Sequence, residues 1–200
     1  MTVPSSNIRP MIDRPQVVQP PMEHRENGED AARLLLDLSG IDLNSKILTR
    51  EQIELRNPHR GQMSLLDGVI WQSEDQTAAV AVHHVRHDEF WVPGHFPNKP
   101  IMPGVLQVEA GAQMACFQWL VRNPGRFIVA FLRIEDASFR SMISPGCDLY
   151  ILCKDVKFGR RRFIADIQGI AAGKIAFDAR VSGMSIPDPR AESETSIPTP

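Results

Sequence analysis

The sequence predicts an α+β domain in which a curved antiparallel sheet of about six strands wraps around one long buried helix. Two observations predict this fold class. Six short segments show the two-residue apolar alternation or β-branched composition of strands, and turn residues separate them. Only one long segment, residues 104–122, reads as a helix, and its residues are apolar on nearly every face.

The strand-like segments follow one another in an order that suits hairpins. Ala78, Val80 and Val82 alternate with other residues in the second segment. Gly159 with its neighbouring arginines, and Ala172-Gly173, are expected to form turns between the last three strands. The expected strands are residues 64–71, 77–85, 127–139, 148–156, 163–171 and 174–181.

The long helix is expected to begin at Gly104 and to be buried all round, because apolar residues fall on nearly every face. Residues 123–125, Asn-Pro-Gly, end it. Two shorter helical segments precede the strands. Residues 29–38 carry leucines on one face, and Thr49 with Gln52 forms a capping box for a turn that ends before Asn57.

The chain divides into an irregular arm at residues 1–28, a single domain with short N-terminal helices at residues 29–185, and an irregular tail at residues 186–200. Both ends are rich in proline and small polar residues. The net charge of -2 gives no strong field for nucleic acid or a membrane surface. No apolar run approaches the roughly 20 residues that cross a bilayer, and no signal peptide is evident.

Three cysteines, Cys116, Cys147 and Cys153, form an odd set without C-x-x-C spacing. This spacing indicates neither a disulfide framework nor a zinc site, so we expect a reducing, cytoplasmic location.

The most informative stretch of the chain runs from Gly94 to Glu109. Four prolines between Pro93 and Pro103 stiffen a loop that carries His95 as its titratable group. Gly104 then opens the helix, where the first N–H groups have no helical partner and favour negative charge. A thioester carbonyl that becomes enolate-like would be stabilised there.

Glu109 lies five residues into the same apolar helix. A carboxyl group in such surroundings must be paired, hydrogen-bonded or protonated. Gln113 lies four residues further on and could hold it in place. Low polarity would raise the pKa of Glu109, as a general acid near neutral pH requires.

Each of these residues also has a purely structural explanation. His95 could stiffen its loop, Glu109 could be an ion-paired core residue, and Gly104 could be an ordinary N-terminal glycine. A candidate general acid, a candidate general base and a helix N-terminus that favours negative charge all lie within 15 residues. This combination favours a catalytic role.

Two charged clusters allow alternative interpretations. His83, His84 and His87 resemble metal ligands, but adjacent strand residues point to opposite faces, so we expect no metal site. The basic residues around Gly159 could be a solvated turn or a docking patch for an acidic carrier protein, with Lys99 or Arg126 contributing. These basic residues are Lys154, Lys157, Arg160, Arg161 and Arg162.

The run Gly-His-Phe-Pro-x-x-Pro-x-x-Pro-Gly-Val from Gly94, followed by Glu-Ala-x-Ala-Gln from Glu109, resembles the 3-hydroxyacyl-(acyl-carrier-protein) dehydratases of type II fatty acid synthesis. Pro58-His59-Arg60 resembles a second segment of that family, and the similarity covers about residues 48 to 183. A related branch of the family, which also isomerises the double bond, carries Asp where this chain has Glu109. The glutamate therefore points away from the isomerase branch. Gly111, where the family often has Met, could widen an acyl tunnel.

The resemblance implies the hotdog fold, with His95 and Glu109 pairing across a dimer interface and the amide of Gly104 serving the thioester carbonyl. We expect the substrate to contact Phe96, Pro103, Val105 and Gln113. The implied partners are an acyl carrier protein and a second copy of the chain, in a homodimer or a hexamer built from dimers. No cofactor or metal is expected.

The expected function is dehydration of (3R)-3-hydroxyacyl-(acyl-carrier protein) to the trans-2-enoyl form, in fatty acid or related lipid biosynthesis. Two alternatives stay open at this point. One is a hotdog hydratase or thioesterase acting on coenzyme A esters. The other is a non-catalytic subunit that binds acyl chains.

Overall fold

The computed structural model describes residues 34–125 and 127–187. The predicted arm at residues 1–28 and most of the predicted tail lie outside the described residues. The elements are β1 (Leu48–Thr49), α1 (Arg50–Glu54), a 3-10 turn (Gly61–Met63), β2 (Gly68–Gln72), β3 (Ala78–Val85), α2 (Gly104–Arg122), β4 (Phe127–Phe139), β5 (Cys147–Phe158), β6 (Arg162–Ala171) and β7 (Lys174–Pro187). None of these helices is long and apolar enough to cross a bilayer.

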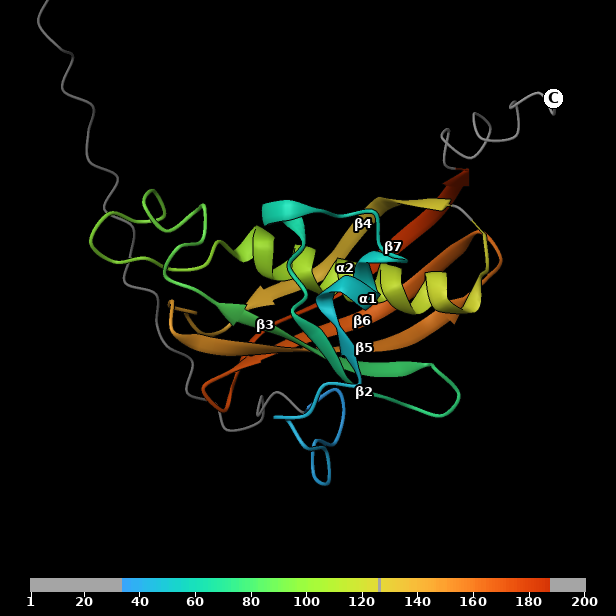
Figure 1. Cartoon of the computed structure of the whole chain (residues 1–200), viewed down its shortest axis with the longest axis horizontal. Helices are drawn as coiled ribbons and strands as arrows, with labels where there is room; N and C mark the ends of the chain where they lie inside the picture. Colours follow the sequence, from blue (N-terminus) through green and yellow to red (C-terminus); the bar gives the residue numbers. More distant parts are fainter. Residues whose placement is uncertain (1–33, 126, 188–200) are drawn as a thin grey trace, which may run out of the picture. The chain divides into compact units, whose positions relative to one another are not determined.

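The strands form one antiparallel sheet in the order β1-β2-β3-β5-β6-β7-β4, and α2 lies across it (Figure 1). The predicted α+β fold class is therefore confirmed, with the two-residue β1 as a seventh strand. Both expected turns are present. Ala172 and Gly173 have φ of 48° and 71°, as a two-residue turn matched to the strand twist requires.

The last strand extends further than the sequence pattern predicts. β7 continues to Pro187, so Ile186 and Pro187 belong to the sheet and not to an irregular tail. The reason is its partner, because β4 begins at Phe127 and pairs with Pro187. A proline is tolerated at the end of a strand, where no further ladder hydrogen bond is needed.

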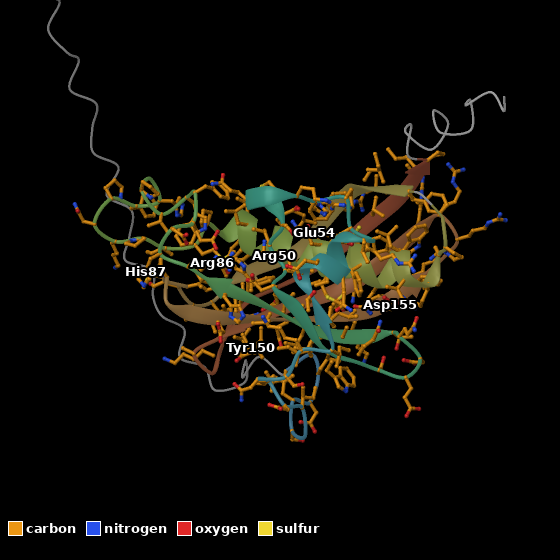
Figure 2. All side chains as sticks on the ribbon, viewed as in Figure 1. Arg50, Glu54, Arg86, His87, Tyr150 and Asp155 are labelled. Atoms are coloured by element: carbon orange, nitrogen blue, oxygen red, sulfur yellow. The ribbon has the colours of Figure 1, made fainter. Side chains whose placement is uncertain are left out.

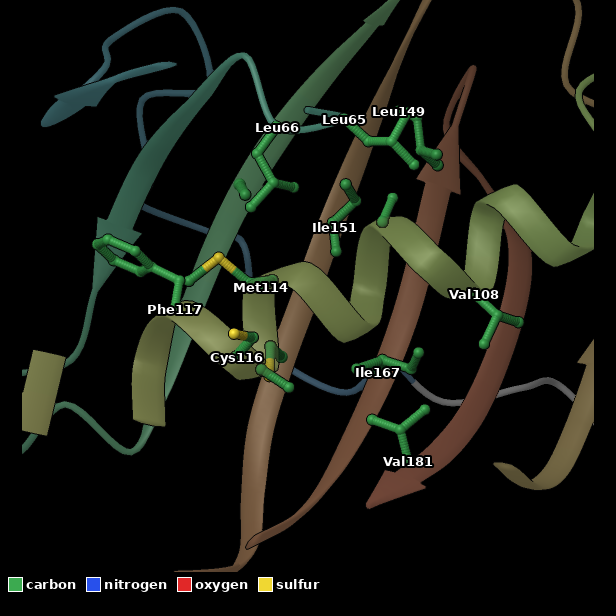
Figure 3. Close-up of a cluster of buried hydrophobic side chains, with 14 of the residues drawn as sticks. Leu65, Leu66, Val108, Met114, Cys116, Phe117, Leu149, Ile151, Ile167 and Val181 are labelled. Carbon is green, nitrogen blue, oxygen red and sulfur yellow. The ribbon is translucent and has the colours of Figure 1, made fainter. Parts of the chain in front are cut away.

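The core lies between α2 and the concave face of the sheet. Figure 3 shows Val108, Met114 and Cys116 of the helix near strands that carry Ile151 and Ile167. The prediction that α2 is buried all round is wrong in two places. Val105 in the first turn is 73% exposed. Glu109 and Ala112 border a pocket beside the edge strand β4.

The opposite face of the sheet is covered by residues 35–43. The predicted helix at residues 29–38 is not formed in its described part, because residues 34–38 are irregular. The Leu35 N–H donates to Gln168 Oε1 at 2.9 Å, which fixes the segment on β6. Tertiary packing thus overrides helix propensity. The segment contributes Leu35, Leu36, Leu38, Ile41 and Leu43 to a cluster around Ile70, Val80, Val82, Leu152 and Ile170.

Helix α2 approaches β6 closely at Gly111. A Cβ at this position would lie 2.4 Å from Cδ1 of Ile167, so the space is already filled. Gly111 does not border the pocket that contains Glu109. The expectation that Gly111 widens an acyl tunnel is therefore wrong, because its small size serves helix-to-sheet packing.

We predict that Gly111→Ala lowers the free energy of unfolding by about 1–3 kcal/mol, the usual cost of overpacking a core. Denaturant unfolding followed by circular dichroism measures this. Combining Gly111→Ala with Ile167→Val removes the clashing methyl and should recover part of the loss. An unchanged stability in the single variant would contradict the packing argument.

Candidate active site

His95 is held in a loop that closes on itself before α2. The His95 N–H donates to the Trp91 carbonyl at 2.9 Å, and the Ile101 N–H donates back to the His95 carbonyl at 2.8 Å. Trp91 is buried, and the Met102 N–H donates to Ile143 O at 2.8 Å, so both ends of the loop are fixed to the core. These hydrogen bonds therefore fix the position of His95.

The imidazole of His95 has a defined tautomer. Its Nδ1 lies 2.7 Å from the Ile101 carbonyl oxygen, and a carbonyl only accepts, so Nδ1 carries the proton. In the neutral form of the ring, Nε2 then carries the lone pair that a general base needs. Phe96 stacks on the ring with centroids 4.2 Å apart while 53% of its own surface stays exposed.

The first turn of α2 follows this loop directly. Pro103 occupies the N-cap position and Gly104 is the first helical residue, so its N–H has no acceptor within the helix. A Cβ on Gly104 would lie 2.8 Å from the ring of Phe139, the last residue of β4. Gly104 is thus needed for the close approach of the edge strand. Val105 is largely exposed beside it.

Glu109 is held by two side chains. The Gln113 amide Nε2 donates to Glu109 Oε1 at 2.9 Å, as the four-residue spacing predicts. His59 Nε2 lies 3.5 Å from the same oxygen. Sequence reasoning did not assign a role to His59, although it lies in the Pro58-His59-Arg60 segment used for the family resemblance.

The segment that carries His59 is fixed to α2 through Gln113. The Leu65 N–H donates to Gln113 Oε1 at 3.0 Å, and Asn57 Nδ2 donates to the Gln113 carbonyl at 2.9 Å. Arg60 donates to the carbonyls of Asn57, His59 and Glu54. These bonds hold the segment in a shape that faces the His59 ring toward Glu109.

Glu109 opens onto a small, partly open pocket. Apart from His59, Gln113 and Ser182, its other lining is apolar or small. Burial and the Glu109 charge raise the pKa of the Cys116 thiol to about 12, so that thiol stays neutral. The pocket is lined by His59, Glu109, Ala112, Gln113, Cys116, Val129, Phe131, Phe163, Val181, Ser182 and Gly183.

His95 does not border this pocket, and within the described part of one chain no hydrogen bond or ion pair joins it to Glu109. Within one chain the two predicted reacting groups are therefore not in direct contact. The basic residues of the predicted docking patch also lie apart within one chain. Lys99 lies in the His95 loop, whereas the β5–β6 hairpin packs on the other end of α2 through the 2.9 Å bond from Trp119 Nε1 to Gly159 O.

The hairpin residues Lys154, Lys157, Arg160, Arg161 and Arg162 are all exposed. Among residues 34–125 and 127–187, the structure gives no ion pair to any of them, and Arg126 lies outside the described residues. Their charge is therefore available to a partner.

The cluster of His83, His84 and His87 forms no metal site in the part of the chain that the structure describes. His83 is fully buried, with Nδ1 3.3 Å from Asp67, whereas His84 is exposed, so the expected alternation holds. Arg50 and Arg86, labelled in Figure 2, both pair with Asp67. Burial alone would raise the pKa of Asp67, but hydrogen bonds from His83 and the two arginines hold it well below its usual range.

The environment of His59 generates a pH-dependent prediction. Burial lowers the pKa of His59, with Glu109 opposing the shift and Arg60 adding to it. The folded chain therefore binds fewer protons at this group than the unfolded chain, so stability falls as pH drops through about 6.5. We predict that the stability advantage of wild type over His59→Gln shrinks between pH 7.5 and 5.5. Urea unfolding at both values tests this, and an advantage that grows at low pH would contradict it.

Comparisons with known proteins place the chain in a family. A family model described as a FabA-like domain matches residues 57–180, more than half of the chain. The chain is 36% identical over 139 residues to the 3-hydroxyacyl-(acyl-carrier-protein) dehydratase FabZ of Acetivibrio thermocellus, which covers 66% of this chain and 94% of the relative. It is 33% identical over 138 residues to the FabZ of Protochlamydia amoebophila, covering 69% and 90%.

The fold comparison agrees with this result. A chain of the dehydratase heterocomplex ApeI:P from Xenorhabdus doucetiae superposes with a TM-score of 0.59 at 15% identity, over 72% of this chain and 97% of that one. The predicted hotdog fold is therefore confirmed, with α2 as the helix enclosed by the sheet. Fold and sequence together show that this chain belongs to the family of FabA-like domains.

Proposed function

We propose that the protein dehydrates (3R)-3-hydroxyacyl thioesters on an acyl carrier protein to trans-2-enoyl thioesters, in fatty acid or related lipid biosynthesis. One observation carries the proposal. The Glu109 carboxyl group, oriented by Gln113, faces a mostly apolar pocket in a chain whose relatives are dehydratases. Such a pocket suits an acyl chain, and a held carboxyl group suits a departing hydroxyl.

The chemistry needs only groups of the protein. Nε2 of His95 removes a proton from C2, and the electron pair forms the C2–C3 double bond as the C3–O bond breaks. Protonated Glu109 donates to the departing hydroxyl, which leaves as water. The N–H of Gly104 stabilises the negative charge that develops on the thioester oxygen.

A second copy of the chain is needed to bring these groups together. Strand β4 is the outer edge of the sheet, and a long exposed edge is a template for pairing with another strand. The edge is also apolar. Its exposed side chains include Phe131, Leu132, Ile134 and Phe139, at 43–54% exposure. We therefore infer a homodimer that joins two sheets along β4.

The two ends of β4 carry the two halves of the site. Val129 near its start lines the Glu109 pocket, whereas Phe139 at its end covers Gly104. In an antiparallel pairing about the middle of the strand, the end of one β4 lies beside the start of the other. This pairing brings His95 of the partner subunit toward Glu109. Each dimer then has two equivalent sites.

The same pairing supports a composite docking surface for the carrier protein. Arg160 and Arg161 lie around Phe127 at the start of β4, so Lys99 of the partner subunit would come near them. Acidic helices of a carrier would be steered to this patch. A hexamer, a cytoplasmic location and substrate contacts by Phe96, Pro103 and Val105 stay predictions.

We predict that the purified protein converts (3R)-hydroxyacyl carrier protein to the enoyl form, and that His95→Ala and Glu109→Gln each lower the rate by about 100-fold or more, as loss of a general base or acid does. Mass spectrometry of the carrier adduct measures the product. Parallel reactions with the coenzyme A ester separate the carrier-dependent enzyme from a coenzyme A hydratase or thioesterase. Wild-type inactivity on every substrate would refute the proposed function.

A mixing experiment tests the shared site. Refolding His95→Ala with Glu109→Gln in equal amounts makes half of the dimers mixed, and each mixed dimer has one site with both groups intact. We predict recovery of about one quarter of wild-type activity on this statistical basis, although each variant alone keeps only about one hundredth of it or less. Absence of recovery, with subunit exchange verified by native mass spectrometry, would show that each site lies within one chain.

A further inference from the structure

We propose that the acyl pocket ends at Phe163, so that the site accepts short and medium acyl chains and excludes long ones. The inference rests on the proposed function and adds the class of substrate. It concerns the end of the pocket away from Glu109, which the chemistry of dehydration does not use.

The path of the acyl chain follows one face of α2. Glu109, Ala112 and Cys116 line the pocket from this face, and Val181 of β7 lines it from the sheet. These helix positions are separated by three and four residues, so they form a continuous stripe. A chain held at C3 by Glu109 therefore extends toward the C-terminal end of α2 as far as Cys116.

The far end of this path is closed by aromatic side chains. The next turn of α2 brings Trp119, which is buried and meets Phe127 edge-on at 5.6 Å between centroids. Phe163 is the second residue of β6 and follows the turn whose Gly159 carbonyl accepts a hydrogen bond from the Trp119 indole. Phe163 thus lies at the Trp119 end of the pocket, and it is 5% exposed.

Phe163 is held in this place by the glycine opposite it. Gly183 pairs with Phe163 on one side, and a Cβ there would lie 2.6 Å from the Phe163 ring. The same Cβ would lie 3.0 Å from Val129, so a side chain at this position would force the Phe163 ring or Val129 to move. The ring therefore fills the space over Gly183 and forms a fixed floor.

The dimensions of the path set the length limit. Seven residues separate Glu109 from Cys116, which is about 10 Å along a helix. With C–C bonds of about 1.5 Å in a zigzag, this distance holds about eight carbons beyond C3. We therefore expect acyl chains of up to about eleven carbons to fit and chains of sixteen carbons to meet Phe163.

The test is the dehydration rate across carriers loaded with 3-hydroxyacyl chains of four, eight, twelve and sixteen carbons. We expect wild type to have kcat/KM about tenfold or more lower for sixteen carbons than for eight, as a blocked apolar pocket gives. Phe163→Ala should raise the ratio of sixteen-carbon to eight-carbon activity about tenfold. Phe163→Leu, with a smaller volume change, should raise it less and serves if the alanine variant does not fold.

The chain offers a matched control. Phe177 is fully buried over Gly169, with a Cβ on that glycine 2.1 Å from its ring, but it does not line the pocket. Phe177→Ala should therefore destabilise the protein without changing the chain-length ratio. Gly183→Ala should push the Phe163 ring into the pocket and lower the ratio of eight-carbon to four-carbon activity.

The outcomes separate the two proposals. Equal wild-type activity at eight and sixteen carbons, or an unchanged ratio in folded Phe163→Ala and Phe163→Leu, would overturn the length limit and leave the dehydratase intact. An equal rise of the sixteen-carbon to eight-carbon activity ratio in Phe177→Ala would also overturn the length limit. The change in chain-length preference would then result from lost stability and not from the pocket floor. No turnover by wild type at any length would overturn the function and the length limit together.

Discussion

The site depends on one buried amide, Gln113. Its nitrogen donates both to Glu109 and to the Met63 carbonyl, and its oxygen accepts from the Leu65 N–H. The carboxyl group of the site, the segment that carries His59 and the central helix are thus fixed by a single side chain that is 2% exposed. An amide is suited to this role because it offers donors and an acceptor at once, without adding a charge to an apolar pocket.

The second constraint is the open edge of the sheet. β4 closes one side of the pocket, yet it presents unpaired backbone groups and apolar side chains outward. The edge of β4 is therefore left unpaired in a single chain, and under the proposed function the Glu109 site would also lack its base. Pairing along β4 would satisfy both needs with one contact, which explains why the His95 loop and the Glu109 pocket lie at opposite ends of the same strand.

Local sequence signals predicted the elements whose partners are local. α2 begins at Gly104 and ends at Arg122 as expected, and the Thr49 capping box forms. Features decided by distant partners were not predictable. Residues 34–38 lie on the sheet instead of forming a helix, and Gly111 packs against Ile167 instead of opening a tunnel. The role of His59 was also hidden, because its 3.5 Å approach to Glu109 depends on the fold of residues 57–65.

One face of α2, formed by Glu109, Ala112 and Cys116, lines both the proposed reaction site and the proposed acyl pocket. In the proposed mechanism Glu109 at one end of the stripe would hold C3, whereas Cys116 lies about 10 Å away along the helix, one turn before Trp119. The helix is rigid over this length, so the reacting carbon and the pocket floor keep a fixed separation. A change at Phe163 can then alter which chains fit without moving the Glu109 carboxyl group. The hydrogen bonds of Gln113 hold that group independently of what fills the far end.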